Sequence, residues 1–125
     1  MQGLKELIAP LNNLASIPDG VCNLSKLENI DLSGNKLSAL PQNIGKLSAL
    51  IKINIDGNNM TELPLSFAKL TKLQEIHIAQ NNLTKFPDYI EKFSNINLID
   101  ASGNQFDHTE IEKIKELAKI FKIKY

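Results

Sequence analysis

The sequence contains no arginine, a single cysteine and no long apolar run. Arginine is the usual residue for bidentate contacts with phosphates and bases, and here 14 lysines are balanced by 14 acidic residues, which argues against a nucleic-acid-binding protein. The lone Cys22 excludes an intramolecular disulfide and a cysteine-cluster metal site. No stretch approaches the roughly 18 apolar residues of a membrane span, and the N-terminus lacks a signal-peptide core. What remains is a 125-residue globular chain, 42% hydrophobic, which can bury a core without disulfides.

A spacing of 23 residues recurs along most of the chain. Three columns follow it: an asparagine, an apolar residue two positions later, and a proline preceded by an apolar residue. The asparagine column consists of Asn12, Asn35, Asn58, Asn81 and Asn104. Such self-similarity is the signature of a repeat protein. The sequence therefore predicts one domain over 1–125, built from repeats 1–23, 24–46, 47–69 and 70–92 and a partial fifth repeat over 93–106.

Each repeat follows the pattern LxxLxxIxLxxNxLxxLPxxIxx, whose parts predict local structure. Alternation of apolar and polar residues, as over 28–32, indicates a short strand whose apolar side chains point inward. The asparagine then ends the strand, and the repeated amides are expected to form a ladder that pairs buried backbone groups. Gly34, Gly57 and Gly103 directly precede three of the asparagines, which suits an unusual backbone conformation. The prolines favour an extended return segment on the opposite side.

This pattern resembles the leucine-rich repeat, in its 23-residue class with a proline after the sixth apolar position. The resemblance covers residues 1–106 and implies an α/β solenoid, with short parallel strands on its concave side and irregular or 3-10 segments on its convex side. Similar repeats occur in intracellular signalling scaffolds of the Ras-suppressor and Scribble type and in bacterial proteins. The resemblance thus implies a cytoplasmic, non-enzymatic module for protein–protein interaction that uses no cofactor.

The two ends of the chain depart from the repeat. Residues 109–124 combine apolar residues at helical spacing with acids at the start and lysines at the end, which predicts a capping helix over the last repeat. Asp107 and Thr109 are alternative N-caps for it. At the other end, Leu4 and Leu7 belong to a repeat with a neighbour on one side only. Solenoid ends normally carry a polar cap, so we expect upstream residues or another chain, including a second copy, to cover this edge.

The outward-facing residues of the strands predict the binding surface. Parallel strands in register bring equivalent side chains about 4.8 Å apart, so these side chains form rows across the sheet. The partner-binding residues predicted on this concave face are Asn29, Asp31, Lys52, Asn54, Asp56, Glu75, His77, Leu98 and Asp100. The face is polar with an acidic excess, so the expected protein partner carries a basic surface. Neither nucleic acid nor a membrane is expected to bind it.

Two chemical roles can be weighed for His77. Catalysis needs a nucleophile beside the histidine, and no serine or cysteine occupies an adjacent position in its row. A transition-metal site needs three or four converging ligands, whereas His77 and Asp100 supply two. Asp31 and Asp56 lack the cage of oxygens that calcium requires. The sequence therefore predicts no catalytic, cofactor-binding or metal-binding residue.

Two alternative functions stay open at this stage. The first is the recognition region of a larger signalling enzyme, such as a Roco-type GTPase/kinase or a cyclase, and additional residues upstream would favour it. The second is a structural repeat protein that self-assembles through the uncapped N-terminal repeat. Concentration-dependent association without another partner would favour that alternative.

Overall fold

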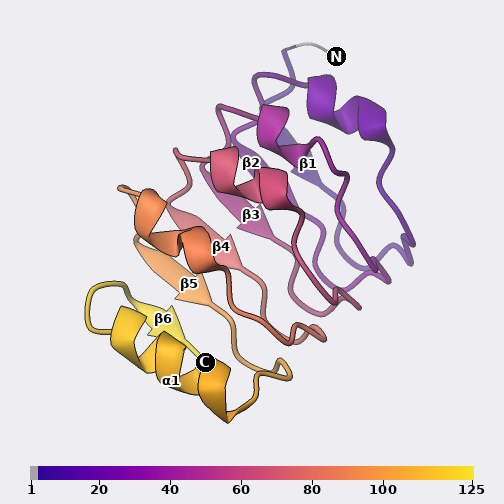
Figure 1. The fold of residues 1–125 in the computed structure, drawn as a ribbon. Helices are drawn as coiled ribbons and strands as arrows, with labels where there is room; N and C mark the ends of the chain where they lie inside the picture. The colour runs from indigo at the N-terminus through magenta and orange to yellow at the C-terminus, as the bar shows by residue number, and fades with distance from the viewer. Residues whose placement is uncertain (1–2) are drawn as a thin grey trace.

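The strands of the chain form one parallel sheet that runs the length of the molecule (Figure 1). The computed structural model describes residues 3–125; Met1, where the first repeat is predicted to begin, lies outside the described residues. The strands are β1 (Glu6–Ile8), β2 (Asn29–Asp31), β3 (Lys52–Asn54), β4 (Glu75–His77), β5 (Leu98–Asp100) and β6 (Ile123–Lys124). Strands that are adjacent in the sheet are also consecutive in the sequence.

The register of the sheet repeats the spacing of the sequence. Ile30 pairs with Ile53, Ile53 with Ile76, and Ile76 with Ile99, so each step to the next strand advances the chain by one repeat. A constant advance of this kind stacks equivalent residues on one another and generates a solenoid. The predicted α/β solenoid with short parallel strands is confirmed.

Short 3-10 segments form the side of the solenoid opposite the sheet (Figure 1). They are η1 (Asp19–Asn23), η2 (Ile44–Lys46), η3 (Leu65–Lys69) and η4 (Asp88–Lys92). Pro18, Pro64 and Pro87 directly precede three of them, with φ angles of −61°, −65° and −58°. The pyrrolidine ring fixes φ in this range, so each proline leads the chain from an extended segment into the 3-10 turn. The predicted 3-10 character of the convex side is also confirmed.

The hydrophobic core lies between the sheet and the 3-10 segments. Ile53, Ile55 and Leu73 are fully buried there, as are the aromatic side chains of Phe67 and Phe93. These residues occupy the apolar positions of the 23-residue pattern and belong to one hydrophobic cluster that runs through the repeats. Because one repeat alone cannot bury such residues, the stacking of neighbours supplies the core.

The asparagines connect successive repeats through hydrogen bonds. Asn58 Oδ1 accepts the N–H of Leu37 at 3.0 Å, and Asn58 Nδ2 donates to Leu32 O at 3.0 Å and to Ile55 O at 2.9 Å. Asn35, Asn81 and Asn104 make the corresponding bonds, whereas Asn12 Nδ2 donates to Pro10 O within its own repeat. The buried main-chain groups of the turns are thereby paired, which removes a desolvation cost that would otherwise oppose folding.

The residue before each ladder asparagine adopts a left-handed backbone conformation. Gly34, Gly57 and Gly103 have φ angles of 66°, 69° and 70°. The same conformation occurs at the equivalent positions Leu11 and Gln80, with φ of 57° and 55°. Glycine adopts this region without steric cost, whereas leucine and glutamine do so against a penalty of about 1–2 kcal/mol.

The C-terminal helix α1 spans His108–Leu117 and is shorter than the predicted helix over 109–124. Asp107 is its N-cap, because its Oδ1 accepts the N–H of Glu110 at 2.9 Å. After Ala118 the chain turns, and the last residues form β6 beside β5. The open edge of β5 explains the difference: Ile99 N–H donates to Lys122 O and Ala101 N–H donates to Lys124 O, bonds that a continued helix would leave unmade.

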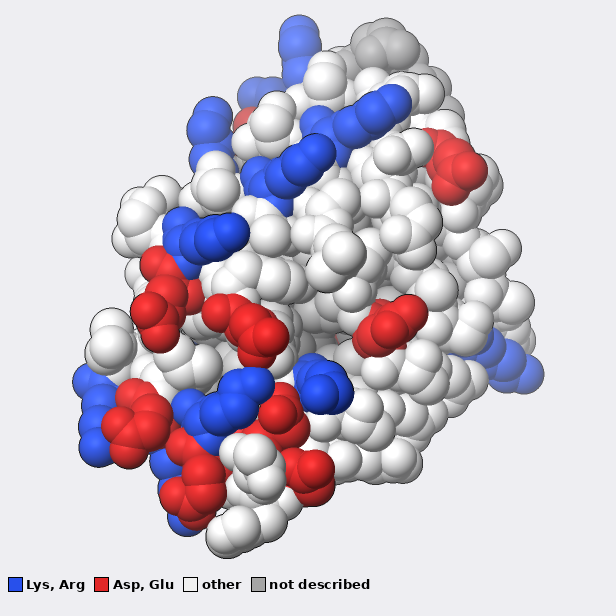
Figure 2. Space-filling model, viewed as in Figure 1, with Lys and Arg blue, Asp and Glu red and all other residues white. Residues whose placement is uncertain are grey.

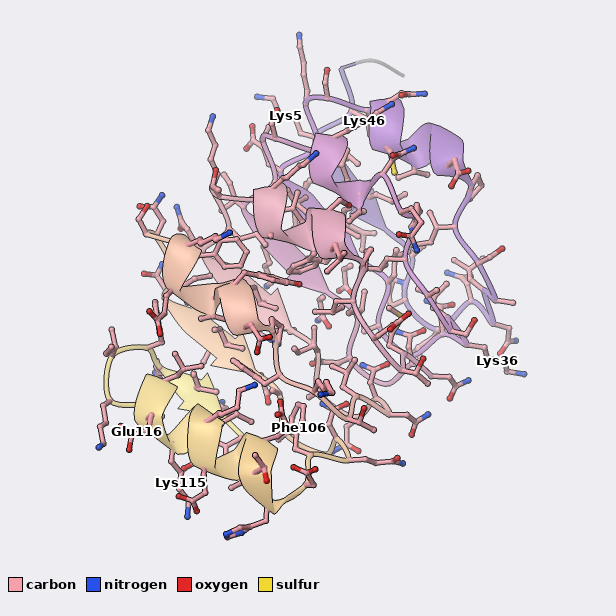
Figure 3. The ribbon with its side chains drawn as sticks, viewed as in Figure 1. Lys5, Lys36, Lys46, Phe106, Lys115 and Glu116 are labelled. Carbon is pink, nitrogen blue, oxygen red and sulfur yellow. The ribbon has the colours of Figure 1, made fainter. Side chains whose placement is uncertain are left out.

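Helix α1 is attached to the fourth repeat through a buried carboxylate. Glu110 Oε1 accepts the N–H of Phe86 at 2.9 Å, and Lys113 Nζ lies 3.2 Å from Glu110 Oε2 and 2.8 Å from Asp88 Oδ1. Ile114, one turn further along, is fully buried in the core. Figure 3 shows Phe106 beside the helix and Lys115 and Glu116 on its outer side. The helix therefore covers the end of the core with one face and presents charge to solvent with the other.

Candidate protein-binding face

The concave side of the sheet carries two complete rows of side chains. The register of β2 to β5 places Asn29, Lys52, Glu75 and Leu98 in one row and Asp31, Asn54, His77 and Asp100 in the next. All of these residues are half-buried, as expected where side chains line the inside of a curved surface. The strands also hold them at fixed spacing, so the face presents an ordered array of polar groups.

Local hydrogen bonds fix the orientation of the second row. Asp31 Oδ1 accepts from the N–H and hydroxyl of Ser33 at 3.1 Å and 2.7 Å. Asp100 Oδ1 makes the same pair of bonds with Ser102 at 3.2 Å and 2.7 Å. In the equivalent position of β3, Asn54 Oδ1 accepts the N–H of residue 56 at 3.0 Å. An amide oxygen therefore fills this structural role as a carboxylate does, which allows charge to be removed without loss of the turn.

Asp56 reaches from the turn after β3 towards the next repeat. Its Oδ1 accepts the N–H of Ala79 at 2.7 Å, and the carboxyl group is half-buried. Burial raises the pKa of Asp56, and the nearby carboxylates of Asp100 and Asp31 raise it further, while the Ala79 N–H and His77 act in the opposite direction. Asp56 is therefore an element of the structure as well as part of the face, because its loss would leave a buried N–H unpaired.

His77 is held against Glu75 on the same strand. Its Nε2 lies 3.0 Å from Glu75 Oε1, and its side chain is 17% exposed. The hydrogen bond with His77 lowers the pKa of Glu75, and the charge of Lys52, whose Nζ lies 4.0 Å from Glu75 Oε1, lowers it as well. These three side chains form a small network across β3 and β4.

Asp56, His77 and Asp100 converge on one point of the face. One ligand atom from each, a carboxylate oxygen or an imidazole nitrogen, lies within 4.8 Å of the other two. The sequence pairs His77 with Asp100 through the row, but it places Asp56 in a different row. Asp56 Oδ1 accepts the N–H of Ala79, which lies one repeat further along, and the row assignment alone does not show in which direction the Asp56 side chain turns.

Strand β6 extends the second row beyond the predicted residues. Lys124 pairs with Asp100 in the parallel register, so a lysine stands at the C-terminal end of the acidic row. The alternation of apolar and charged residues over 121–125 is the signal that could have predicted a strand here. The concave face is consequently acidic in its middle and basic at this edge.

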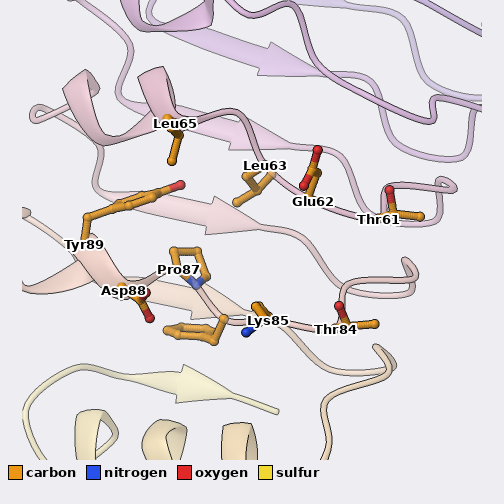
Figure 4. Close-up of a pocket in the computed structure, with 10 residues that line it drawn as sticks. Thr61, Glu62, Leu63, Leu65, Thr84, Lys85, Pro87, Asp88 and Tyr89 are labelled. Carbon is orange, nitrogen blue, oxygen red and sulfur yellow. The ribbon is translucent and has the colours of Figure 1, made fainter.

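The convex side differs from this face in its charges and its shape. Figure 2 shows that side, with lysines spread over the first repeats and mixed charge gathered over α1. A hollow of about 360 Å³ lies between η3 and η4 and is lined by Leu63, Leu65, Pro87 and Tyr89 together with polar side chains (Figure 4). Leu65 is 86% exposed at its rim. The Tyr89 hydroxyl is buried and has no hydrogen-bond partner within residues 3–125, and burial raises its pKa.

Comparison with known proteins identifies the family. The model of the leucine-rich repeat region matches residues 12–125, and the chain belongs to this family. A leucine-rich repeat protein of Leptospira interrogans is 31% identical, with a TM-score of 0.83 over 89% of this chain and 28% of that protein. An internalin of Listeria monocytogenes shares the fold at 20% identity, with a TM-score of 0.71 over 88% of this chain and 34% of its own.

The chain therefore spans about a third or less of the length of these two solved structures. A comparison with curated protein sequences gave no match. Within residues 3–125, no helix has the length and apolar character needed to cross a bilayer.

Proposed function

We propose that this chain is a non-enzymatic protein-interaction module that binds a protein partner through its concave face. The observation that carries the proposal is the pair of ordered rows on β2 to β5, in which hydrogen bonds hold Asp31, Asp100 and His77 before any partner arrives. Side chains that are already ordered lose little conformational entropy on binding. Leucine-rich repeat domains typically use such a surface for protein partners, and the 23-residue pattern favours a cytoplasmic signalling scaffold.

The charges of the face define the kind of partner. Asp31, Asp56, Glu75 and Asp100 give the middle of the face an acidic character, although the chain as a whole is neutral. A partner with basic residues opposite these groups would associate faster and more selectively than a neutral one. Leu98, half-buried in the first row, offers an apolar contact within the same surface. We therefore expect binding to a basic protein surface that weakens as salt is added.

The test removes negative charge from the concave face while keeping the hydrogen bonds that hold the turns. Asp31→Asn combined with Asp100→Asn retains an amide oxygen for the bonds to Ser33 and Ser102, as Asn54 already does for its own turn. The matched control, Glu62→Gln with Glu91→Gln, makes the same change in net charge at exposed convex positions. Partners are captured from extracts of the source cell with each protein, and their association rates are then measured.

The concave variant should bind on the order of tenfold more slowly than the wild type, because steering by charge is lost. The convex variant should bind as the wild type does. Equal binding by the wild type and the concave variant, with loss in the convex variant, would move the binding surface to the other side of the solenoid.

Self-association through the N-terminal edge is a second candidate, favoured by the apolar residues exposed there. Leu4, Leu7 and Leu14 are half-buried, and Leu11 is 82% exposed. Contiguous apolar surface on a solenoid end is a typical interaction site. Sedimentation equilibrium should detect concentration-dependent association of the wild type. Leu11→Asn, which suits the left-handed backbone at this position, should reduce it; a strict monomer at all concentrations would exclude this candidate.

A further inference from the structure

Asp56, His77 and Asp100, which lie within the proposed binding face, also converge as a set of metal-donor groups. The three residues come from three successive repeats: Asp56 follows β3, His77 ends β4 and Asp100 ends β5. Their ligand atoms lie within 4.8 Å of one another, and all three side chains are half-buried. We propose that these residues bind a divalent transition-metal ion, with Zn²⁺ as the best match, on the concave face.

The separation of the donor atoms is close to what a metal requires. With metal–ligand bonds of about 2.0–2.1 Å, two ligands in a tetrahedral site stand about 3.3 Å apart. The observed limit of 4.8 Å is larger than this, so the carboxylate side chains would have to rotate towards one another to bind the ion. The strands need not move, because the register of β4 and β5 already sets His77 beside Asp100.

Each ligand is oriented by a partner outside the donor set. Glu75 Oε1 lies 3.0 Å from His77 Nε2, and a hydrogen donated from that nitrogen leaves the lone pair of Nδ1 for the metal. The N–H of Ala79 engages Asp56 Oδ1, and Ser102 engages Asp100 Oδ1 through two bonds. These bonds engage Oδ1 of each aspartate and leave Oδ2 available for the ion. A carboxylate behind a ligating histidine is a recurrent feature of protein metal sites.

The donor chemistry selects the kind of ion. An imidazole nitrogen with two carboxylate oxygens suits zinc, manganese or cobalt, whereas calcium and magnesium prefer oxygen ligands alone. The two aspartates repel each other at this separation, and Asp31 adds to the negative potential. A divalent cation would relieve that repulsion. Three protein ligands leave a fourth position open, as in zinc sites that accept water or an outside group.

The experiment is a calorimetric titration of the full chain with ZnCl₂, without any protein partner. We expect one zinc per chain, and an affinity that falls at least tenfold in His77→Gln and in Asp100→Asn. Glu75→Gln should weaken binding by about tenfold, because it acts through the orientation of His77. Asp31→Asn, which removes a charge from the same row but no ligand, should change the affinity by less than about threefold. His108→Gln and Cys22→Ser control for binding at the other histidine and at the thiol.

A second readout reports the ligands directly. In the Co²⁺-loaded protein, the histidine bound to the paramagnetic ion should show a strongly shifted ring-proton NMR signal that disappears in His77→Gln. Thermal unfolding of each variant establishes that it is folded. No zinc uptake by the folded wild type, or uptake unchanged in His77→Gln, would overturn the proposal. Because this titration uses no partner, its failure leaves the protein-binding proposal intact, and the failure of partner capture leaves the metal site intact.

Discussion

At the C-terminal end of the solenoid, α1 and β6 cover the last repeat, whereas at the opposite end none of residues 3–125 packs on the outer side of the first repeat (Figure 1). Ile114 closes the core and is fully buried, and β6 pairs with the edge of β5. Leu7, in the inward position of β1, packs against the core but stays half-buried. The two ends thus differ in whether the outer side of the terminal repeat is covered. Comparing them shows what such a cover contributes to stability.

The C-terminal cap does more than bury apolar surface. Glu110 also forms a specific bond to the fourth repeat, because its carboxylate accepts the N–H of Phe86. Lys113 then links Glu110 to Asp88 of η4. At the N-terminal end, the side chain of Asn12 bonds within its own repeat. Stability should therefore rise from the N-terminal repeat towards the C-terminal one.

The largest expected effect comes from removing each end in turn. Deletion of 107–125 removes α1 and β6 and exposes the core of the last repeat, so it should cost more than the roughly 2–5 kcal/mol of one large core truncation. Deletion of 1–23 replaces one open repeat edge by an equivalent one and should cost clearly less. Urea unfolding of both truncated chains provides the measurement. Equal losses, or a larger loss from the N-terminal deletion, would contradict the comparison.

Single side-chain truncations at the two ends should show the same asymmetry on a smaller scale. Ile114→Ala creates a cavity in a fully buried site and should lower the free energy of unfolding by about 2–5 kcal/mol. Leu7→Ala removes a half-buried side chain and should lower it by about 1 kcal/mol, in proportion to its smaller burial. Denaturation midpoints of the two variants measure this pair. A cost for Leu7→Ala as large as that for Ile114→Ala would show that the N-terminal edge is covered in solution.

The buried carboxylate of the cap can be separated from its apolar contacts. Glu110→Ala leaves the Phe86 N–H without its acceptor and should lower stability by about 1–3 kcal/mol. Glu110→Gln keeps a side-chain oxygen for that bond and should recover much of the loss. Thermal unfolding of both variants provides the check. Identical behaviour of the alanine and glutamine variants would mean that the hydrogen bond to Phe86 is not what attaches the helix.

The smallest expected effect concerns the ion pair between the cap and η4. The hydrogen bond from Lys113, together with its charge, lowers the pKa of Asp88 in the folded protein. This contribution to stability is present above the usual pKa of an aspartate and is lost as pH falls through the lowered folded pKa. Because the pair is exposed, it should amount to about 1 kcal/mol or less. Asp88→Asn should flatten this part of the stability–pH curve below about pH 4; an unchanged curve would show that the pair contributes nothing.

The repeat made most of the fold predictable, because the 23-residue spacing marked the repeats and their resemblance to leucine-rich repeats implied the parallel strands. The rows containing Asp31, His77 and Asp100 follow from the same spacing. The approach of Asp56 to His77 was not predicted, because the spacing does not show in which direction the Asp56 side chain turns. Strand β6 was missed because five alternating residues compete with a helical pattern in the same segment. The sequence places Glu110 in the acidic first turn of the helix, and only the packing of α1 shows its carboxylate to be buried.

The backbone N–H groups bound to the ladder asparagines can report the difference in stability between the two ends. The N–H groups of Leu14, Leu37, Met60 and Leu83 each donate at 3.0 Å to the asparagine side chain of the following repeat. These bonds are chemically equivalent and differ in their position along the solenoid. Native-state hydrogen exchange should therefore give the weakest protection at Leu14 and the strongest towards Leu83. Uniform protection along the ladder, or the strongest protection at Leu14, would contradict the claim that the C-terminal cover stabilises the stack from one end.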